Sequence, residues 1–334
     1  MAKITLFKLN AVEKAFFKKH LKGHELTFVN NPLTSRNASR YKQTEIAVVF
    51  VFSQISKEVI DKLPNLKSIA TMSTGYDHID ADYARQKNIF VSNVPFYGQN
   101  TVAEHAFGLL IALNRNLIEA VRRTREGKFS YEGLQGRDIS GKTLGVFGTG
   151  RIGQYMIKFA KAFNMKVIAF DVFKNIKLAK DLGFTYASKN QVLKKSDFIS
   201  LHLPLLPSTK HYISKDEFKL MKKESMLINT SRGGLIDTDA LIQALNKKQI
   251  AGVALDVLEL ETDFKREAQI ISSDGCSKER LKVLVENEDL IHRDNVIITP
   301  HLAFYTEEAT QRILKTTYQN INAFLKGKCK NKVK

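Results

Sequence analysis

Four polar residues, Arg232, Asp256, Glu261 and His301, each follow a short apolar stretch that is typical of a buried strand. Ligands of open α/β sheets bind beyond the carboxyl ends of the strands, so these side chains could converge on one site. A guanidinium group binds anions, and an imidazole exchanges protons near neutral pH. Taken singly, an Arg after a strand is more often structural, and a His is more often packed in a core or exposed on a surface. The four residues therefore predict a functional site only together with the motifs around them in the sequence.

A second group of residues has the spacing of a nucleotide site. Gly148, Gly150 and Gly153 form the pattern Gly-x-Gly-x-x-Gly directly after an apolar stretch. Helical spacing of apolar residues follows, and then a second apolar stretch that ends at Asp171. In such a unit the glycines permit a tight turn, close approach of a pyrophosphate and close helix packing, while the acid accepts hydrogen bonds from ribose hydroxyls. The sequence predicts a dinucleotide site here; the alternative is a glycine turn that binds nothing.

Apolar stretches of strand length alternate with helical patterns along the whole chain, which indicates parallel α/β sheets. A chain of 334 residues is also long enough for two domains. A mostly apolar helix is expected over 101–121, with Thr101 as its N-cap, packed between domains or subunits. The expected strands lie near 3–9, 45–52, 67–72, 89–95, 144–147, 167–170, 197–204, 226–230, 252–257 and 296–301.

The composition is that of a water-soluble globular protein, with 43% apolar and 26% charged residues. There is no apolar run of membrane-spanning length, and the N-terminal residues lack the pattern of a signal peptide. Cys276 and Cys329 cannot form a disulfide framework and are typical of a reducing cytoplasm. No Cys/His cluster has the spacing of metal ligands, so we expect a cytoplasmic protein without a metal site or a membrane partner.

The formal net charge of +18 arises from 52 Lys and Arg residues against 34 Asp and Glu residues. Such a balance can mark a nucleic-acid-binding protein. Here the basic residues are spread along the chain, except for the tail 326–334, and no basic motif is interleaved with aromatic residues. The pattern favours a solvated cationic surface over a nucleic-acid partner, and this surface would attract an anionic substrate and cofactor.

Three blocks, 229–237, 254–261 and 299–306, resemble the signatures of D-isomer-specific 2-hydroxyacid dehydrogenases, and the resemblance extends over nearly the whole chain. Within the family, Tyr97, the block that begins at His301 and the insertion after Glu261 are similar to the D-lactate dehydrogenase branch. The sequence departs from the family at two positions. Leu258 replaces a common Tyr, and Leu260 stands where Gly is common before the acid.

The resemblance implies an α/β fold of two Rossmann-like domains with doubly wound parallel sheets. A discontinuous substrate (catalytic) domain is expected over 1–100 plus 301–334, and an NAD-binding domain over 101–300. The active site would lie in the cleft between the domains, and hinge closure would exclude water.

The resemblance also implies the roles of individual residues. Arg232, Glu261 and His301 would be the catalytic triad: Arg232 binds the substrate carboxylate and polarises its carbonyl, His301 is the general acid and base, and Glu261 favours the imidazolium. The residues implied for the cofactor NAD are Gly148, Gly150, Arg151, Ile152, Gly153, Asp171, Leu203, Pro204, Thr209, Thr230, Ser231, Arg232 and Asp256. Those implied for the substrate are Thr74, Gly75, Tyr97, Arg232, Phe304 and Tyr305.

The implied reaction is the reversible reduction of pyruvate by NADH to D-lactate, in an enzyme expected to be a homodimer. Two alternatives remain open. One is a D-2-hydroxyacid dehydrogenase of broader specificity for bulkier 2-oxo acids. The other is a non-catalytic protein that binds and senses NADH, which the intact Arg, Glu and His set disfavours.

Overall fold

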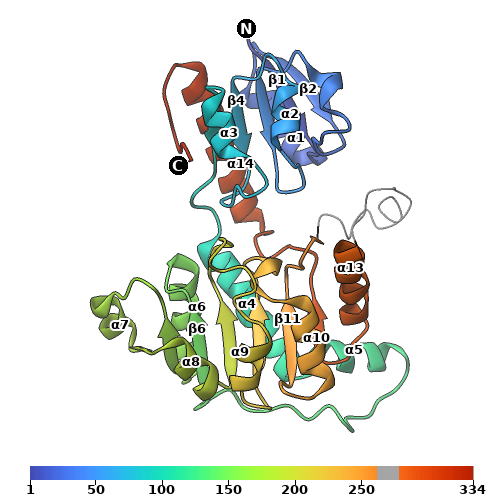
Figure 1. Cartoon of the computed structure of the whole chain (residues 1–334), viewed down its shortest axis with the longest axis vertical. Helices are drawn as coiled ribbons and strands as arrows, with labels where there is room; N and C mark the ends of the chain where they lie inside the picture. The colour runs from blue at the N-terminus through green and yellow to red at the C-terminus, as the bar shows by residue number, and fades with distance from the viewer. Residues whose placement is uncertain (262–277, 334) are drawn as a thin grey trace. The chain divides into compact units, whose positions relative to one another are not determined.

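The computed structural model describes residues 1–261 and 278–333, which form two compact units (Figure 1). The first unit comprises Met1–Gly98 and Tyr305–Lys334, and the second comprises Gln99–Phe304. Each unit has helices around a sheet in which all the paired strands are parallel. The predicted α/β class with two parallel-sheet units is therefore confirmed.

The sheet of the first unit has the order β2-β1-β3-β4-β5. β3 and β4 are buried along their whole length because helices cover the sheet. The C-terminal helix α14 contacts α1 and β4, so this unit is built from both ends of the chain. The strands are β1 (Lys3–Phe7), β2 (Glu25–Val29), β3 (Ile46–Val49), β4 (Ser68–Thr71) and β5 (Phe90–Ser92). The helices are α1 (Ala11–His20), η1 (Ala38–Tyr41), α2 (Lys57–Asp61), α3 (Ala81–Gln86) and α14 (Glu307–Leu325).

The sheet of the second unit has the order β12-β11-β10-β9-β6-β7-β8. The chain runs from β6 to β7 on one side and returns to β9 on the other, so the order changes direction between β6 and β9, where such sheets bind their ligands. The strands are β6 (Thr143–Phe147), β7 (Lys166–Phe170), β8 (Thr185–Tyr186), β9 (Phe198–Leu201), β10 (Met226–Asn229), β11 (Gly252–Leu255) and β12 (Val296–Ile298). The helices are α4 (Gln99–Asn114), α5 (Leu117–Arg125), α6 (Arg151–Ala162), α7 (Ile176–Leu182), α8 (Lys189–Lys195), α9 (Lys215–Leu220), η2 (Gly233–Leu235), α10 (Thr238–Asn246) and α13 (Lys278–Ile291).

The core of the second unit lies on both faces of its sheet. Phe147 and Leu201 point to the face covered by α8, α9 and α10. The alternate residues Val146 and Phe198 point to the opposite face, which α4 and α6 cover. Side chains alternate between the two faces of a strand, so strands buried on both faces are mostly apolar, as β6 and β9 are apart from Thr143 and Ser200.

The helix expected over 101–121 is two helices. α4 ends at Asn114 and α5 begins at Leu117, because Asn116 has the left-handed conformation with φ +51°. Asn tolerates this conformation better than most residues, since its short polar side chain avoids much of the steric cost. Thr101 lies inside α4 and is buried rather than capping it. The apolar side of α4 contacts α6, β10 and β11, which accounts for its hydrophobicity within one unit.

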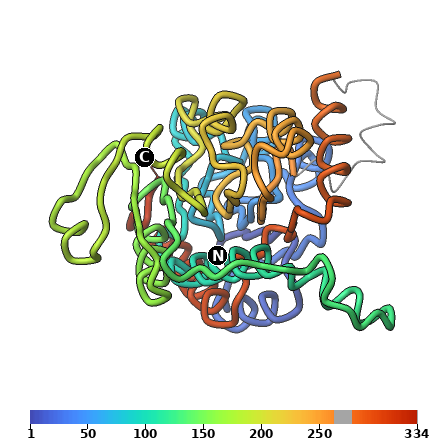
Figure 2. The backbone as a smooth tube through the Cα atoms, turned by 90° about the horizontal axis from the view of Figure 1, so that it is seen from below, coloured from blue at the N-terminus to red at the C-terminus, as the bar shows by residue number. Residues whose placement is uncertain are grey.

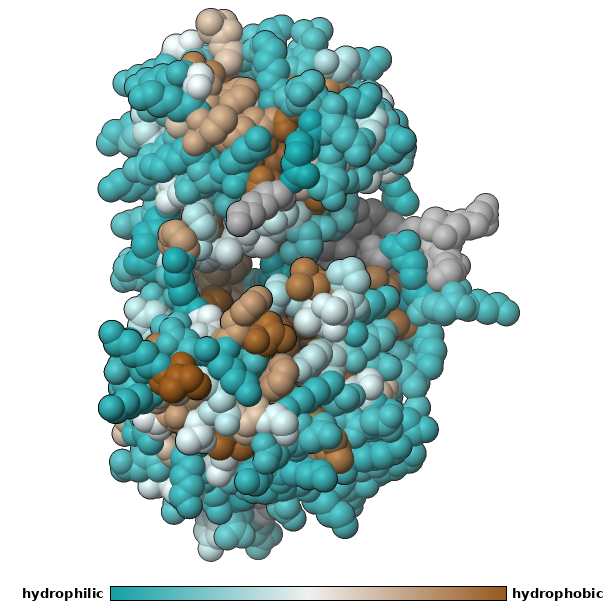
Figure 3. All heavy atoms as spheres, turned by 60° about the vertical axis from the view of Figure 1, so that its left-hand side comes forward, coloured by the Kyte–Doolittle hydropathy of each residue, from teal (hydrophilic) through white to brown (hydrophobic). Residues whose placement is uncertain are grey.

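The surface, the helices and the cysteines bear on the expectations drawn from the composition. Hydrophilic residues cover most of the face seen in Figure 3. Among residues 1–261 and 278–333, no helix is both long and apolar enough to cross a membrane. Cys276 lies outside the described residues, and Cys329 is an exposed free thiol.

Candidate active site

The glycine turn after β6 is shaped for a phosphate-bearing ligand. Gly148 has φ +92°, and a Cβ there would collide with the carbonyl oxygen of His202 at the end of β9. A Cβ on Gly153 would collide with the carbonyl oxygen of Gly148, so the glycine lets α6 lie close to the turn. Gly150 precedes α6 and has open space beside it. The open N-terminus of α6, where Arg151 and Ile152 begin the helix, therefore presents N–H groups to the approach that a pyrophosphate would use.

Asp171 is fixed beside this turn. Its carboxylate accepts hydrogen bonds from the backbone N–H and hydroxyl of Thr149 at 2.7 and 2.9 Å, and from the N–H of Phe173 at 3.0 Å. The Tyr186 hydroxyl lies 2.9 Å from the Thr149 hydroxyl and so supports it. Partial burial raises the pKa of Asp171, but these hydrogen bonds outweigh burial and hold the pKa below its usual value. Asp171 is thus an ionised acceptor at neutral pH, as recognition of ribose hydroxyls requires.

The predicted cofactor residues after β9 and β10 lie at the same edge of the sheet. The Thr209 hydroxyl donates to the carbonyl of Pro204 at 2.6 Å and so closes the turn that begins at Leu203. The Ser231 hydroxyl donates to the carbonyl of Leu201 at 2.7 Å and joins the two strand ends. The Thr230 hydroxyl is buried and has no hydrogen-bond partner among the described residues. A buried hydroxyl is normally satisfied, so this one fits a polar ligand at the edge.

His202 lies at this edge too, and no motif in the sequence predicts a function for it. Burial lowers the pKa of its ring to about 4, so the imidazole is neutral at physiological pH. Its Nε2 is 2.9 Å from the Ser200 hydroxyl, while Nδ1 is buried without a partner in the described part of the chain. Together with the glycine turn, Asp171 and Thr230, this edge offers hydrogen-bond donors and acceptors of the kinds that NAD needs.

Arg232 lies in the turn between β10 and η2. Its Nη1 donates to the carbonyl of Ser231 at 2.7 Å, and its own carbonyl accepts from the Asn229 side chain at 2.8 Å. The next residue, Gly233, has no room for a Cβ, which would collide with the backbone of Leu258 and Glu259. The loop that leads to Glu261 is therefore seated directly against the turn that carries Arg232.

His301 and Glu261 form a close pair. Nδ1 of His301 is 2.6 Å from Oε1 of Glu261, and the two side chains are 16% and 29% exposed. The pair uses Nδ1, which leaves Nε2 as the other nitrogen of the ring. Both positions depend on unusual backbone geometry, because His301 has φ +55° and Leu260 has φ +56°. Left-handed residues other than Gly are strained and cluster at functional sites.

Asp256 fixes the turn that carries His301. Its carboxylate accepts from the Thr299 hydroxyl at 2.6 Å and from the N–H groups of Leu302 and Ala303, each at 2.9 Å. His105 Nε2 lies 3.5 Å from the same carboxylate. Burial raises the pKa of Asp256, but these partners together hold it below its usual value. In the structure, Asp256 thus supports His301 from both sides in addition to the cofactor role that the sequence predicts.

The predicted substrate residues divide between the two units. Thr74 and Gly75 follow β4 in the first unit, where the Thr74 hydroxyl donates to the carbonyl of Val94 and the Ser73 hydroxyl to that of Gly75, both at 2.7 Å. Tyr97 accepts a hydrogen bond from Arg312 through its carbonyl. Tyr305 belongs to the same unit and is 60% exposed, whereas Phe304 belongs to the second unit. Their convergence on Arg232 and His301 stays a prediction.

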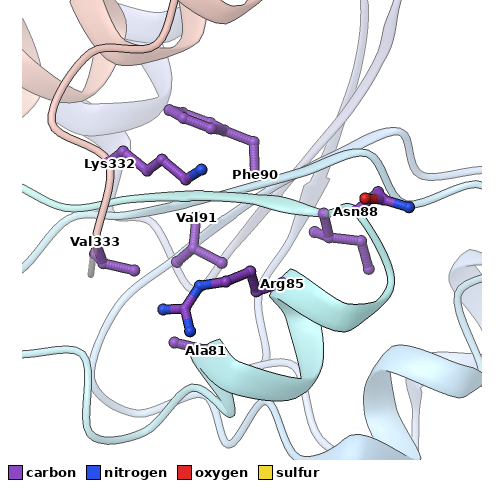
Figure 4. A pocket seen from close by; sticks show the side chains of 8 residues that line it. Ala81, Arg85, Asn88, Phe90, Val91, Lys332 and Val333 are labelled. Atoms are coloured by element: carbon purple, nitrogen blue, oxygen red, sulfur yellow. The ribbon is translucent and has the colours of Figure 1, made fainter.

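A pocket of about 200 Å³ lies elsewhere, in the first unit (Figure 4). None of the predicted site residues lines it. Arg85 of α3 and Lys332 of the C-terminal segment are its charged residues, and the remaining walls are Ala81, Asn88, Ile89, Phe90, Val91 and Val333. In the described residues, no group of three or more His, Cys, Asp and Glu side chains could hold a metal ion.

Comparison with known proteins identifies the family. Residues 107–303 match the model of the D-isomer specific 2-hydroxyacid dehydrogenase NAD binding domain. The chain is 37% identical to a D-lactate dehydrogenase of Escherichia coli over 96% of this chain and 97% of that protein. It is 36% identical to a glyoxylate reductase of Thermococcus litoralis over 86% and 82% of the two chains.

Among solved structures, a D-lactate dehydrogenase of Aquifex aeolicus complexed with NAD and lactic acid superposes with a TM-score of 0.87 at 35% identity, over 97% of this chain and 96% of that one. The expectations of an NAD-dependent enzyme and of NAD as its cofactor are confirmed, which removes the sensing alternative. The chain belongs to the D-isomer-specific 2-hydroxyacid dehydrogenases, a family of NAD-dependent oxidoreductases.

Proposed function

We propose that this enzyme is a D-lactate dehydrogenase that reduces pyruvate reversibly to D-lactate with NADH. The observation that carries the proposal is the His301–Glu261 pair at 2.6 Å, in the same unit as Arg232 and the glycine turn. Similarity over nearly the whole chain to D-lactate dehydrogenases supports pyruvate as the substrate. In this assignment, the unit Gln99–Phe304 binds NAD, in place of the expected 101–300, and the unit Met1–Gly98 with Tyr305–Lys334 binds the substrate, in place of the expected 1–100 with 301–334.

In the proposed reaction, the Arg232 guanidinium binds the pyruvate carboxylate and polarises the carbonyl oxygen. The backbone N–H groups of Thr74 and Gly75 complete the carboxylate site. The pocket for the methyl group is lined by Tyr97, Phe304 and Tyr305. NADH supplies the hydride that C2 receives. The carbonyl π electrons become an oxyanion, which takes the proton from Nε2 of His301. Glu261 stabilises the imidazolium through Nδ1 before the transfer and fixes its orientation. The reverse reaction uses neutral His301 as the base.

A panel of 2-oxo acids tests the substrate. With NADH, we expect the highest kcat/KM for pyruvate, and in reverse we expect oxidation of D-lactate but not of L-lactate. Changing His301 to Ala should lower kcat about 10²- to 10⁴-fold, the usual contribution of a positioned general acid. A preference for glyoxylate would place the enzyme with the glyoxylate reductases, and a preference for branched 2-oxo acids would favour the broader dehydrogenase; either result contradicts the proposal.

We also propose that the enzyme is a homodimer that associates through α5. Figures 1 and 2 both show this helix extending away from the sheet of its unit. Leu117, Ile118 and Val121 on α5 are 45%, 60% and 49% exposed, and Phe129 and Tyr131 beyond it are 94% and 90% exposed. Apolar side chains gathered on a projecting element are typical of an interface, and a second copy of the chain would cover them reciprocally.

Light scattering after gel filtration tests the dimer. The parent should have about twice the chain mass of 37.8 kDa, and Ile118→Glu with Val121→Glu should give the monomer. Val285→Glu is the matched control, because Val285 is 66% exposed on α13 and should leave the mass unchanged. A monomeric parent, or a dimer that survives the α5 changes, contradicts this interface.

A cytoplasmic location is proposed as well, since the exposed thiol of Cys329 suits a reducing compartment.

A further inference from the structure

The loop between β11 and Glu261 contains a third acid, Glu259, to which the sequence and the family resemblance gave no role. Its side chain is 15% exposed, although a carboxylate is costly to bury without partners. Oε1 lies 2.8 Å from Nε2 of His211, and Oε2 accepts from the Thr238 hydroxyl at 2.9 Å. The backbone carbonyl of Glu259 accepts from the side chain of Asn287 at 2.8 Å. Both the side chain and the backbone of Glu259 are therefore held by hydrogen bonds.

The three partners of Glu259 come from separate elements. His211 lies between β9 and α9, Thr238 is the first residue of α10, and the fully buried Asn287 belongs to α13. His211 is itself held on its other side, since Nδ1 lies 4.0 Å from the carboxylate of Asp237. Partners that arrive from three directions fix the position of the loop and not only the rotamer of one side chain.

The same partners connect this loop to the turn of Arg232. The backbone N–H of His211 donates to the carbonyl of Gly234 at 2.8 Å. A Cβ on Gly233 would collide with the backbone of Leu258 and Glu259, so the loop and the turn are in direct contact there. The side-chain bond between His211 and Glu259 thus links the segment that carries Arg232 to the segment that carries Glu261.

The residue between Glu259 and Glu261 shows why such support is needed. Leu260 has φ +56°, a conformation that a Leu adopts only when the surrounding contacts impose it. On its C-terminal side, Glu261 is held by His301 at 2.6 Å. On its N-terminal side, the contacts of Glu259 supply the restraint. Release of Glu259 would let Leu260 relax and move the Glu261 carboxylate away from His301.

We infer that Glu259 is a positioning residue, which holds the loop against the Arg232 turn so that Glu261 meets His301. This inference rests on the proposed roles of Glu261 and His301. It predicts that loss of Glu259 reproduces the effect of losing Glu261, although the Glu259 carboxylate bonds to His211 and Thr238 and not to His301. A residue that only stabilised the fold would lower the melting temperature without this catalytic signature.

The test compares Glu259→Ala, Glu259→Gln and Glu261→Gln in the full-length enzyme. Glu259→Ala should lower kcat for pyruvate reduction about 10- to 100-fold, the scale of a catalytic group misplaced by about 1 Å, and should move the pH–rate profile toward acid as Glu261→Gln does. NADH affinity, measured by fluorescence titration, should change less than about twofold. Glu259→Gln, which can still accept from Thr238, should recover part of kcat. Because the two acids act as one unit, Glu259→Ala should add little to Glu261→Gln in the double variant.

Asp239→Ala is the matched control, since Asp239 is half-exposed on α10 and its carboxylate bonds to Gln243 and Lys282 and not to the loop. It should keep the parental kcat and pH profile. The inference is overturned if both Glu259 variants keep the parental pH profile and kcat, or if Glu259→Ala and Glu261→Gln add independently. If Glu261→Gln itself leaves the profile unchanged, the proposed catalytic role of Glu261 fails instead. Should Glu259→Ala not fold, Glu259→Gln gives the same comparison with a smaller displacement.

Discussion

Replacing Glu261 with Gln probes the charge of the His301 partner while keeping its shape. The two groups are 2.6 Å apart, and both side chains are less than a third exposed, so water screens the interaction only partly. The backbone N–H of Leu258 also points to Glu261, at 3.4 Å. The amide of Gln has one acceptor oxygen, so it can accept from either Nδ1 of His301 or the N–H of Leu258. The change therefore removes the negative charge together with one of these two contacts.

The expected size follows from the strength of a hydrogen bond between charged groups, about 1.5–3 kcal/mol. A neutral hydrogen bond from the Gln side chain still contributes about 0.5–1.5 kcal/mol, so about 1–1.5 kcal/mol is lost, which should lower the reduction rate at neutral pH about tenfold. The sign follows from the reaction. Reduction needs protonated His301, and the carboxylate favours that form, so without it the reduction rate should fall at a lower pH. Oxidation needs neutral His301, and its rate should rise at a correspondingly lower pH.

The assay is NADH absorbance in both directions, with kcat/KM for pyruvate and for D-lactate measured from about pH 5 to 9. Glu288→Gln provides the control, because Glu288 pairs with His292 at 3.0 Å on the exposed face of α13. This variant should keep both parental profiles. Parental midpoints in the Glu261→Gln enzyme would refute the reasoning, and so would opposite displacements of the two directions.

Three further predictions concern other parts of the site. Arg232→Lys should lower kcat/KM for pyruvate about 10²-fold or more, because an ammonium cannot hold a carboxylate and a carbonyl in the geometry of the guanidinium fork; near-parental kinetics would make Arg232 structural. NADH should be preferred strongly over NADPH, because the ionised Asp171 repels a 2′-phosphate, and Asp171→Ala should narrow the ratio of the two kcat/KM values; equal use of both cofactors by the parent would contradict this. Asp256→Asn should lower the melting temperature at neutral pH. Because the pKa of Asp256 is lower in the folded protein, its ionised carboxylate stabilises the fold above the ordinary Asp pKa of about 3.9, and this stabilisation is lost as the pH falls through the folded-state pKa. The melting temperatures of parent and variant should therefore converge in acid. A difference in melting temperature that does not change with pH would show that the carboxylate charge is not its cause.

The parts of the site that the sequence predicted best are those set by local chemistry. The turn at Gly148 and Gly153 needs residues without a Cβ because backbone carbonyls occupy the space, so the glycine spacing alone locates it. Asp171 ends the next strand along, which places its carboxylate beside the same turn. In a parallel sheet the ends of adjacent strands meet at one edge, and for this reason the sequence could place these residues together.

The parts that escaped prediction depend on contacts between distant segments. The break between α4 and α5 at Asn116 has no Gly or Pro to mark it, and the apolar spacing continues across it. Asp256 was placed with the cofactor residues, and its bonds to Thr299, Leu302 and Ala303 involve residues more than 40 positions away. Residue types and spacing do not contain the pairings that decide such roles.

At Leu260 the family resemblance and the backbone conformation in the structure bear on the same position. The family resemblance marks its position as one where Gly is common, and the structure gives the physical reason, since φ is +56° there. A Gly would adopt this conformation without strain, but it would leave Glu261 on a more flexible backbone. With Leu, the conformation has to be imposed by Glu259 on one side and His301 on the other. In the proposed role of Glu259, the position of the Glu261 carboxylate is therefore a property of the whole loop and its partners, and no single residue of the motif determines it.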